Sequence, residues 1–259
     1  MEWVSFLAVS LAAFVAASLT LYSGFGLGTL MLPVFALFLP VEMAVVATAL
    51  VHGANNVFKV SLLGRHADRD VILRFGLPAV IAAVLGALVL GMLAGVSGGE
   101  AATSGAGPLK VTIGLMMIAF ALFEVLPAFS KLAFERRWLP LGGLLSGFFG
   151  GLSGHQGALR SAFLAKSGLN TEGFVGSNAV IALLVDLTRI TVYTGLFAVA
   201  GGSAAQVSAW PLVVAGAAAA FCGVMLGKRY LHKVTMRSVQ LLVGAMLFGV
   251  GFALLFGLL

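Results

Sequence analysis

A few charged and amide side chains lie within stretches that are otherwise apolar. Arg160 follows His155, Gln156 and Gly157 in a segment too short to cross a bilayer. A charge at that depth is costly and by default functional, and the planar guanidinium suits a pair of oxyanion oxygens. We therefore predict that Arg160 binds an anion. The alternative is an arginine whose side chain reaches the cytoplasmic interface.

Asp186 and Arg189 are three residues apart in a long apolar stretch and so share one helix face. A functional interpretation makes Arg189 a second anion ligand, with Asp186 as its orienting partner or as a proton-coupling carboxylate. A structural ion pair inside the bundle is the alternative. The excess of basic residues on the cytoplasmic side does not explain Arg189, because its expected position lies toward the outside.

Two adjacent amides, Asn55 and Asn56, need hydrogen-bond partners if they lie in the membrane. His52 could line the same helix face as Asn55, although a buried, satisfied histidine is more common than a ligand. For Lys59 we expect a side chain that snorkels to the cytoplasmic interface, because it falls near a helix end. Asn178 adds one amide in the second half of the chain.

The composition places these residues in a membrane protein. Of the 259 residues, 61% are hydrophobic and 9% are charged, whereas soluble domains have about 25% charged residues. A soluble fold and intrinsic disorder are both excluded by this apolar content. The net charge of +6 does not indicate nucleic acid, because the basic residues form short clusters between apolar spans, as membrane orientation requires.

Apolar spans follow one another along the chain at 3–22, 29–39, 41–63, 71–96, 108–126, 138–152, 158–166, 174–200, 207–226 and 239–258. The spans 29–39 and 158–166 are too short for a hydrocarbon core of about 30 Å, since a helix rises about 1.5 Å per residue. Each follows a glycine-rich break, at 23–28 and 150–157. We expect an all-α polytopic membrane protein with broken or re-entrant hairpins.

The distribution of Lys and Arg assigns the sides of the membrane. Basic residues cluster at 65–74, 131–137 and 228–237, while the loops near 98–100 and 201–203 have none. With the basic loops in the cytoplasm, both termini lie outside. On this path each half of the chain is a broken hairpin followed by three transmembrane helices, and the two halves have opposite orientation.

The chain is therefore expected to form an inverted repeat within one integral membrane domain: residues 1–127, a cytoplasmic linker at 128–137, and residues 138–259. Asn56 and Lys59 recur as Asp186 and Arg189, 130 positions later in both cases. Inverted repeats with broken helices in corresponding positions are typical of secondary transporters, whose solute binds near the middle of the membrane.

The glycine breaks predict where the solute binds. Unwound backbone at membrane depth is tolerated only around a protein-lined or watery cavity, and a half-helix that begins there directs free N–H groups into it. The alternative is glycine used only for close helix packing. The predicted substrate-binding residues are Gly26, Gly28, Thr29, Asn55, Asn56, Ser153, His155, Gln156, Gly157, Arg160, Ser161, Asn178 and Arg189, with Asp186 in a coupling or orienting role.

No motif in the sequence indicates an enzyme. Metalloprotease, P-loop and nucleophile-elbow patterns are absent. His155 has no second histidine or cysteine at metal-ligand spacing, so we expect neither a metal nor another cofactor. Glu42, Glu124 and Glu172 fall near predicted helix ends, where we expect them to face headgroups or basic loops.

The stretch from Ser146 to Ser161, together with the glycine-rich breaks and Pro33, resembles the sulfite exporter TauE/SafE family of bacterial membrane proteins. The resemblance covers essentially the whole chain and implies an inner-membrane carrier that exports small sulfur-containing anions. The sequence departs from the family pattern at 26–29 and at 155–157, and Ala162 stands where proline would fall. These departures lie at the predicted site and leave the identity of the anion open.

Together these observations predict a secondary transporter that exports a small anion, sulfite or an organosulfonate, by alternating access in the bacterial inner membrane. The contrasting hypotheses are a channel or carrier for a different small solute, and a membrane-embedded enzyme or assembly factor. The expected partners are the small anionic substrate and the lipid bilayer, and not nucleic acid. The coupling ion, with protons as one candidate, and a homo-oligomeric state stay open.

Overall fold

A computed structural model describes residues 2–19, 27–97, 107–130, 132–199, 204–230 and 236–259. These residues form helices joined by turns, with an isolated β-bridge between Glu135 and Lys166. The predicted all-α class is confirmed, and the long helices lie within a few residues of the predicted spans. The helices are α1 Glu2–Leu19, α2 Leu27–Ala36, α3 Val41–Leu63, α4 Arg69–Val71, α5 Leu77–Ser97, α6 Pro108–Val125, α7 Pro127–Ser130, α8 Leu139–Ser153, α9 Gly157–Leu164, α10 Thr171–Val199, α11 Ala204–Tyr230 and α12 Met236–Leu255.

Five stretches within the described residues are long and apolar enough to cross a membrane: Val41–His66, Arg69–Gly95, Pro108–Val125, Thr171–Leu196 and Ala209–Leu226. Shorter apolar helices are Trp3–Leu19, Leu27–Ala36 and Gln240–Leu255. Large apolar side chains cover the outside of the bundle, as on α1, where Trp3, Leu7 and Leu11 are mostly exposed. Such a surface suits lipid rather than water, and the chain is a multi-pass membrane protein.

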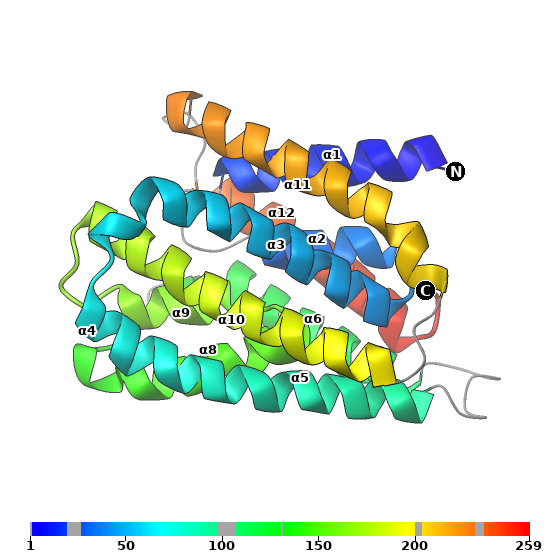
Figure 1. The fold of residues 1–259 in the computed structure, drawn as a ribbon, viewed down its shortest axis with the longest axis horizontal. Coiled ribbons are helices and arrows are strands. Elements are labelled where there is room, and N and C mark those ends of the chain that lie inside the picture. The colour runs from blue at the N-terminus through cyan, green and yellow to red at the C-terminus, as the bar shows by residue number, and fades with distance from the viewer. Residues whose placement is uncertain (1, 20–26, 98–106, 131, 200–203, 231–235) are drawn as a thin grey trace.

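Several charged side chains pair with one another near α4. At one end lies α4, whose Asp70 pairs with Arg74 at 2.8 Å and with Arg136 at 3.0 Å. Both chain termini lie at the opposite end (Figure 1). This is the relative placement that the sequence-derived path requires. Which side of the membrane each end faces stays a prediction.

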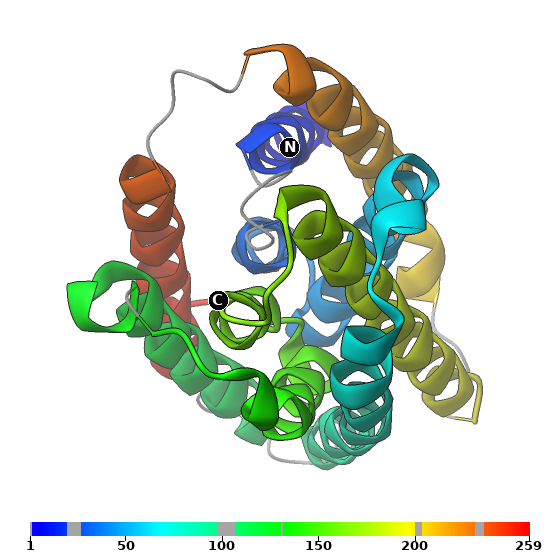
Figure 2. The same ribbon diagram turned by 90° about the vertical axis from the view of Figure 1, so that its left-hand side faces the viewer.

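Helices α2 and α9 lie in the middle of the bundle, surrounded by the longer helices when it is viewed from the α4 end (Figure 2). All ten residues of α2 are buried, and so are five of the eight residues of α9. At a rise of about 1.5 Å per residue they span about 15 Å and about 12 Å. Neither helix therefore crosses a hydrocarbon core of about 30 Å.

The long helices pack across the two halves of the chain. The longer arm of each predicted broken hairpin lies on a helix of the other half: α1 packs on α11, and α8 packs on α5. In the α1–α11 contact, a Cβ added to Gly223 would collide with the backbone of Phe14. Close backbone approach at small residues is how helices associate in lipid, where the hydrophobic effect gives no drive.

The contact between α8 and α5 depends on a ridge of glycines. Gly143, Gly147 and Gly151 recur at every fourth position of α8 and so share one face. A Cβ added to Gly147 would collide with the carbonyl oxygen and Cα of Ala79 in α5. The two backbones are therefore in direct contact, with no room for even a methyl group.

We expect Gly147→Ala to destabilise the protein, because the new methyl group must push α8 away from α5. Overpacking of this kind typically costs about 1–3 kcal/mol. Gly195→Ala in α10 is the matched control, because a Cβ there meets nothing within 4 Å in the described structure and alanine is the better helix former. Thermal unfolding in detergent micelles compares the two. An unchanged melting temperature for Gly147→Ala would contradict the backbone contact.

Candidate functional site

The start of α2 and the glycine-rich end of α8 meet in the middle of the bundle. Helix α8 ends at Ser153 and is capped by Gly154, whose φ of 87° lies in the left-handed region that favours glycine. A Cβ added to Gly28, in the first turn of α2, would lie 3.4 Å from the carbonyl oxygen of Gly154. The first turn of α2 and the α8–α9 turn, which come from opposite halves of the chain, are therefore in contact.

A small polar pocket, called here the central pocket, lies at this meeting point. Two cationic side chains, Lys59 and Arg160, line it, and no carboxylate belongs to its described lining. The first turns of α2 and α9 both contribute, so the positive ends of two helix dipoles face the pocket. The lining residues are Gly28, Thr29, His52, Asn56, Lys59, Gly154, Gln156, Gly157, Arg160 and Asn178.

Arg160 is almost completely buried and is held from two sides. Its Nε donates to Oδ1 of Asn178 at 2.5 Å, and its Nη1 donates to Oε1 of Gln156 at 2.7 Å. Asn178 belongs to α10, whereas Gln156 immediately precedes α9. These two bonds fix the plane of the guanidinium at the wall of the central pocket.

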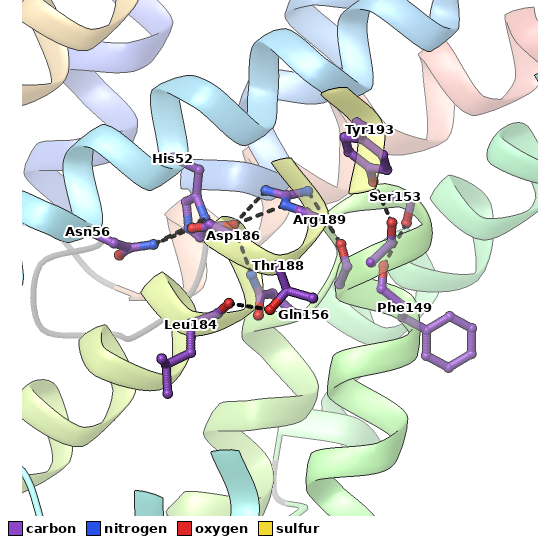
Figure 3. Close-up of polar contacts among 12 residues, drawn as sticks. His52, Asn56, Phe149, Ser153, Gln156, Leu184, Asp186, Thr188, Arg189 and Tyr193 are labelled. Carbon is purple, nitrogen blue, oxygen red and sulfur yellow. Dashed lines mark hydrogen bonds and ion pairs between the residues drawn. The ribbon is translucent and has the colours of Figure 1, made fainter. Parts of the chain in front are cut away.

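Asp186 of α10 joins the central pocket to α3 and to the α8–α9 turn (Figure 3). Its Oδ2 accepts from Nδ2 of Asn56 at 2.7 Å and lies 2.7 Å from Nδ1 of His52. Its Oδ1 accepts from Nε of Arg189 at 3.0 Å and from Nε2 of Gln156 at 3.3 Å. A fully buried carboxylate requires such donors and a cation, because an isolated charge at this depth is very costly.

Arg189 and Tyr193 of α10 hold the end of the broken helix α8. Nη1 of Arg189 donates to the carbonyl oxygen of Gly150 at 3.3 Å, and the Tyr193 hydroxyl donates to that of Gly151. Carbonyl groups at a helix C-terminus lack a full set of donors within the helix. A Cβ on Gly154 would lie 2.5 Å from Nη1 of Arg189, so only glycine fits between the turn and this guanidinium.

Seven of the residues predicted to bind substrate line the central pocket: Gly28, Thr29, Asn56, Gln156, Gly157, Arg160 and Asn178. Arg189 and Asp186 lie behind this lining, to which Asp186 is bonded through Gln156 and Asn56. Gly26 lies outside the described residues.

The other predicted residues, Asn55, Ser153, His155 and Ser161, are not part of this lining. Nδ1 of His155 lies 2.9 Å from Oγ of Ser153, and its ring stacks on Phe120 of α6 with centroids 5.2 Å apart. Asn55 is fully buried, and neither of its amide atoms has a hydrogen-bond partner. A substrate-binding role for these four residues stays a prediction.

His52, Lys59 and Gly154 line the central pocket although they were not predicted to bind substrate. The interpretation of Lys59 as a snorkelling residue is wrong, because its side chain is buried. Helical spacing could have indicated its place, since residues three and four apart share a face and Lys59 follows Asn56 by three. The expectation for Glu124 is also wrong: its side chain is buried, and its Oε1 has no hydrogen-bond partner.

The chemistry available in the central pocket is hydrogen-bond donation and positive charge. Among the described residues, no group of three His, Cys, Asp or Glu side chains is arranged to hold a metal ion. The side chains of Arg160 and Lys59 are both hydrogen-bond donors. The first helical hydrogen bond at the start of α9 runs from the Arg160 N–H to the Gln156 carbonyl. The N–H groups of the residues before Arg160 therefore lie ahead of the helical hydrogen-bond pattern. Such a set can bind and release an anion.

A sequence profile of the family described as sulfite exporter TauE/SafE matches residues 9–254 of the 259. The chain belongs to this family. The resemblance noted from the sequence is thereby confirmed, and the match includes both breaks and every residue of the central pocket. No curated protein and no solved structure matches the chain.

Membership in the TauE/SafE family identifies the protein as a membrane transporter of the sulfite or sulfonate type. A small anion and the membrane lipid are accordingly its partners. The family is one of transporters rather than of enzymes, which agrees with a pocket built from donors and cations.

We expect Asp186→Asn to destabilise the protein strongly, because it leaves Arg189 as a buried cation without its carboxylate. Removal of one partner of a buried ion pair typically costs about 3–5 kcal/mol. The double variant Asp186→Asn/Arg189→Gln removes both charges, so its loss should be smaller than the sum of the two single losses. Denaturant unfolding in detergent micelles measures all four proteins of this cycle.

The control for this cycle is the surface pair of Glu135 and Arg137, whose charged atoms lie 3.0 Å apart with both side chains mostly exposed. Glu135→Gln should change stability little, because solvent screens such a pair. Additive losses at Asp186 and Arg189 would contradict a direct ion pair in the folded protein.

Proposed function

We propose that the protein is a secondary transporter that exports a small anion, sulfite or an organosulfonate, and binds it in the central pocket. The observation that carries this proposal is a pocket lined by two buried cations, Lys59 and Arg160, and by the first turns of two half-helices. Cations at membrane depth are retained where they serve a solute or ion pathway. A small oxyanion carries the negative charge and the acceptor oxygens that suit such groups.

The donors of the central pocket suit a compact oxyanion. Sulfite and sulfonates present three oxygens around one sulfur atom, and in their ionised forms these oxygens accept hydrogen bonds. The N–H groups of Gly157 and its successors point from the start of α9, and Arg160 belongs to the same first turn. Because Asn178 and Gln156 already orient this guanidinium, little order must be gained when the anion binds.

Helix packing supports an inverted repeat of residues 1–127 and 138–259, joined by a linker at 128–137. Let α1, α2, α3, α5 and α6 correspond in order to α8, α9, α10, α11 and α12. When each helix is replaced by its counterpart in the other half, the α1–α11 contact becomes the α8–α5 contact, and the α3–α11 contact becomes the α10–α5 contact. All four of these contacts are present in the structure. Helices α3 and α10 are counterparts of each other, and so are α6 and α12. The same replacement therefore leaves the α3–α10 and α6–α12 contacts unchanged, and both contacts are present.

In the α3–α10 and α6–α12 contacts, which join corresponding helices, individual residues also meet in pairs. Asn56 and Asp186, which correspond in the repeat, are hydrogen-bonded at 2.7 Å. In the α6–α12 contact, a Cβ on Gly114 would lie 2.7 Å from the Gly251 carbonyl oxygen, and a Cβ on Gly251 would lie 2.9 Å from that of Gly114. Reciprocal contacts of this kind are expected near a two-fold axis.

The central pocket takes five lining residues from each half of the chain: Gly28, Thr29, His52, Asn56 and Lys59 from the first, and Gly154, Gln156, Gly157, Arg160 and Asn178 from the second. A relative movement of the halves would therefore change access to the pocket from either end of the bundle. This is the geometry that alternating access requires in transporters with inverted repeats.

We expect Arg160→Ala to lower the rate of saturable sulfite and methanesulfonate flux in proteoliposomes at least about tenfold. Hydrogen bonds to charged groups contribute about 1.5–3 kcal/mol, and about 1.4 kcal/mol corresponds to a factor of ten. Arg160→Lys keeps the charge but loses the planar fork, so its flux should fall between those of Arg160→Ala and wild type.

Arg74→Ala is the matched control, because Arg74 is mostly exposed at the α4 end and pairs with Asp70. Its flux should equal that of wild type. Melting temperatures in detergent identify variants that fail to fold. Undiminished flux in a folded Arg160→Ala protein would remove Arg160 from the binding site, and a steady current that never saturates would indicate a channel.

The proposal also sets the orientation of the protein in the bacterial inner membrane. The basic α4 end would face the cytoplasm and both termini the outside. Green fluorescent protein fused after Leu259 should then stay dark, because it does not mature after export in unfolded form, whereas alkaline phosphatase at the same position should be active. The opposite pair of results would reverse the assigned orientation.

A further inference from the structure

His52 is held in one tautomer by its neighbours on α3 and α10. Its Nδ1 lies 2.7 Å from Oδ2 of Asp186, so one proton must lie between two atoms that would otherwise repel. Oδ2 already accepts from Asn56, and Oδ1 faces the guanidinium of Arg189. Asp186 is thus the acceptor, and Nδ1 of His52 carries the proton and donates it.

The opposite edge of the imidazole faces the central pocket. His52 belongs to the pocket lining, whereas Asp186 does not. The Cδ2 atom, which is bonded to Nε2, lies 3.5 Å from the position of a Cβ on Gly28 in the first turn of α2. With Nδ1 committed to Asp186, Nε2 is the ring nitrogen whose protonation can change. It is a bare acceptor in neutral histidine and a charged donor in imidazolium.

The charged groups around His52 come from three helices. Lys59 lies on α3 itself, Arg160 on α9, and Asp186 and Arg189 on α10. Helix α2 has no charged residue, and the described side chains of α11 include none. The charged residues of α6 are Lys110 and Glu124, which lie near its two ends. Three cations disfavour an imidazolium in the empty pocket, and one carboxylate favours it. A bound anion adds the missing negative charge.

We propose that His52 takes up a proton at Nε2 when an anion enters the central pocket, so that anion binding and protonation of His52 are coupled. This inference rests on the proposed function of the pocket. An oxyanion oxygen beside bare Nε2 would face a lone pair, whereas the same oxygen beside protonated Nε2 accepts a charge-assisted hydrogen bond. Because linkage is reciprocal, the anion raises proton affinity as much as the proton raises anion affinity.

The test uses methanesulfonate, an anion that does not itself titrate near neutral pH. Calorimetric titration of the purified full-length protein, in two buffers with different ionisation enthalpies, counts the protons taken up per anion bound. Wild type should take up about one proton, and its affinity should rise by up to about tenfold for each pH unit of acidification. His52→Asn keeps a donor near Nδ1 for Asp186 but lacks Nε2, so its binding should be weaker, nearly independent of pH and without proton uptake.

His52→Gln is the second variant, because it places an uncharged amide near the Nε2 position; it too should take up no proton. His66→Asn is the matched control, since His66 pairs with Glu172 at 3.2 Å outside the pocket and should keep the proton uptake of wild type.

The outcomes separate this inference from the proposed function. Methanesulfonate binding by wild type without proton uptake, or uptake that persists in a folded His52→Asn protein, would overturn the role of His52 and leave the anion site standing. An absence of methanesulfonate binding at every pH would overturn the sulfonate site and the proton site together.

Discussion

The carboxylate of Asp186 and its five nitrogen neighbours form the interaction on which the middle of the bundle depends. Oδ2 meets His52 and Asn56 of α3, and Oδ1 meets Gln156 and two nitrogens of Arg189. Arg160, Arg189 and Lys59 are all buried cations, and Asp186 is the anion that α10 places among them. Without it, positive charge would accumulate in a region that water cannot screen.

Asp186 also orients Gln156, which is uncharged, and through Gln156 it orients Arg160. Gln156 donates to Asp186 through Nε2 and accepts from Arg160 through Oε1. An amide with its NH₂ committed to a carboxylate can present only its oxygen to the other side. The guanidinium of Arg160 therefore takes its position from a carboxylate on another helix, and this order exists before any anion binds.

The sequence predicted the elements well because apolar span length and glycine breaks are local properties. The short spans 29–39 and 158–166 correspond to α2 and α9, and seven predicted residues line the central pocket. Contacts between elements were not predictable in the same way. The glycine ridge of α8 indicates that some helix packs closely, but only the structure identifies α5 as that helix. Lys59 shows the same limit, since its depth depends on how α3 is set against α2 and α10.

The proposed inverted repeat explains why its two halves must differ at the centre. Asn56 and Asp186 correspond in the repeat and touch each other, as residues near a two-fold axis do. If both were carboxylates, two like charges would meet in a low dielectric, whereas an amide opposite a carboxylate donates a hydrogen bond. The next pair along these helices differs as well: Lys59 lines the central pocket, while Arg189 is tied to Asp186 and to the end of α8. One carboxylate thus contacts both halves, and Lys59 lines the central pocket, where an anion can meet it.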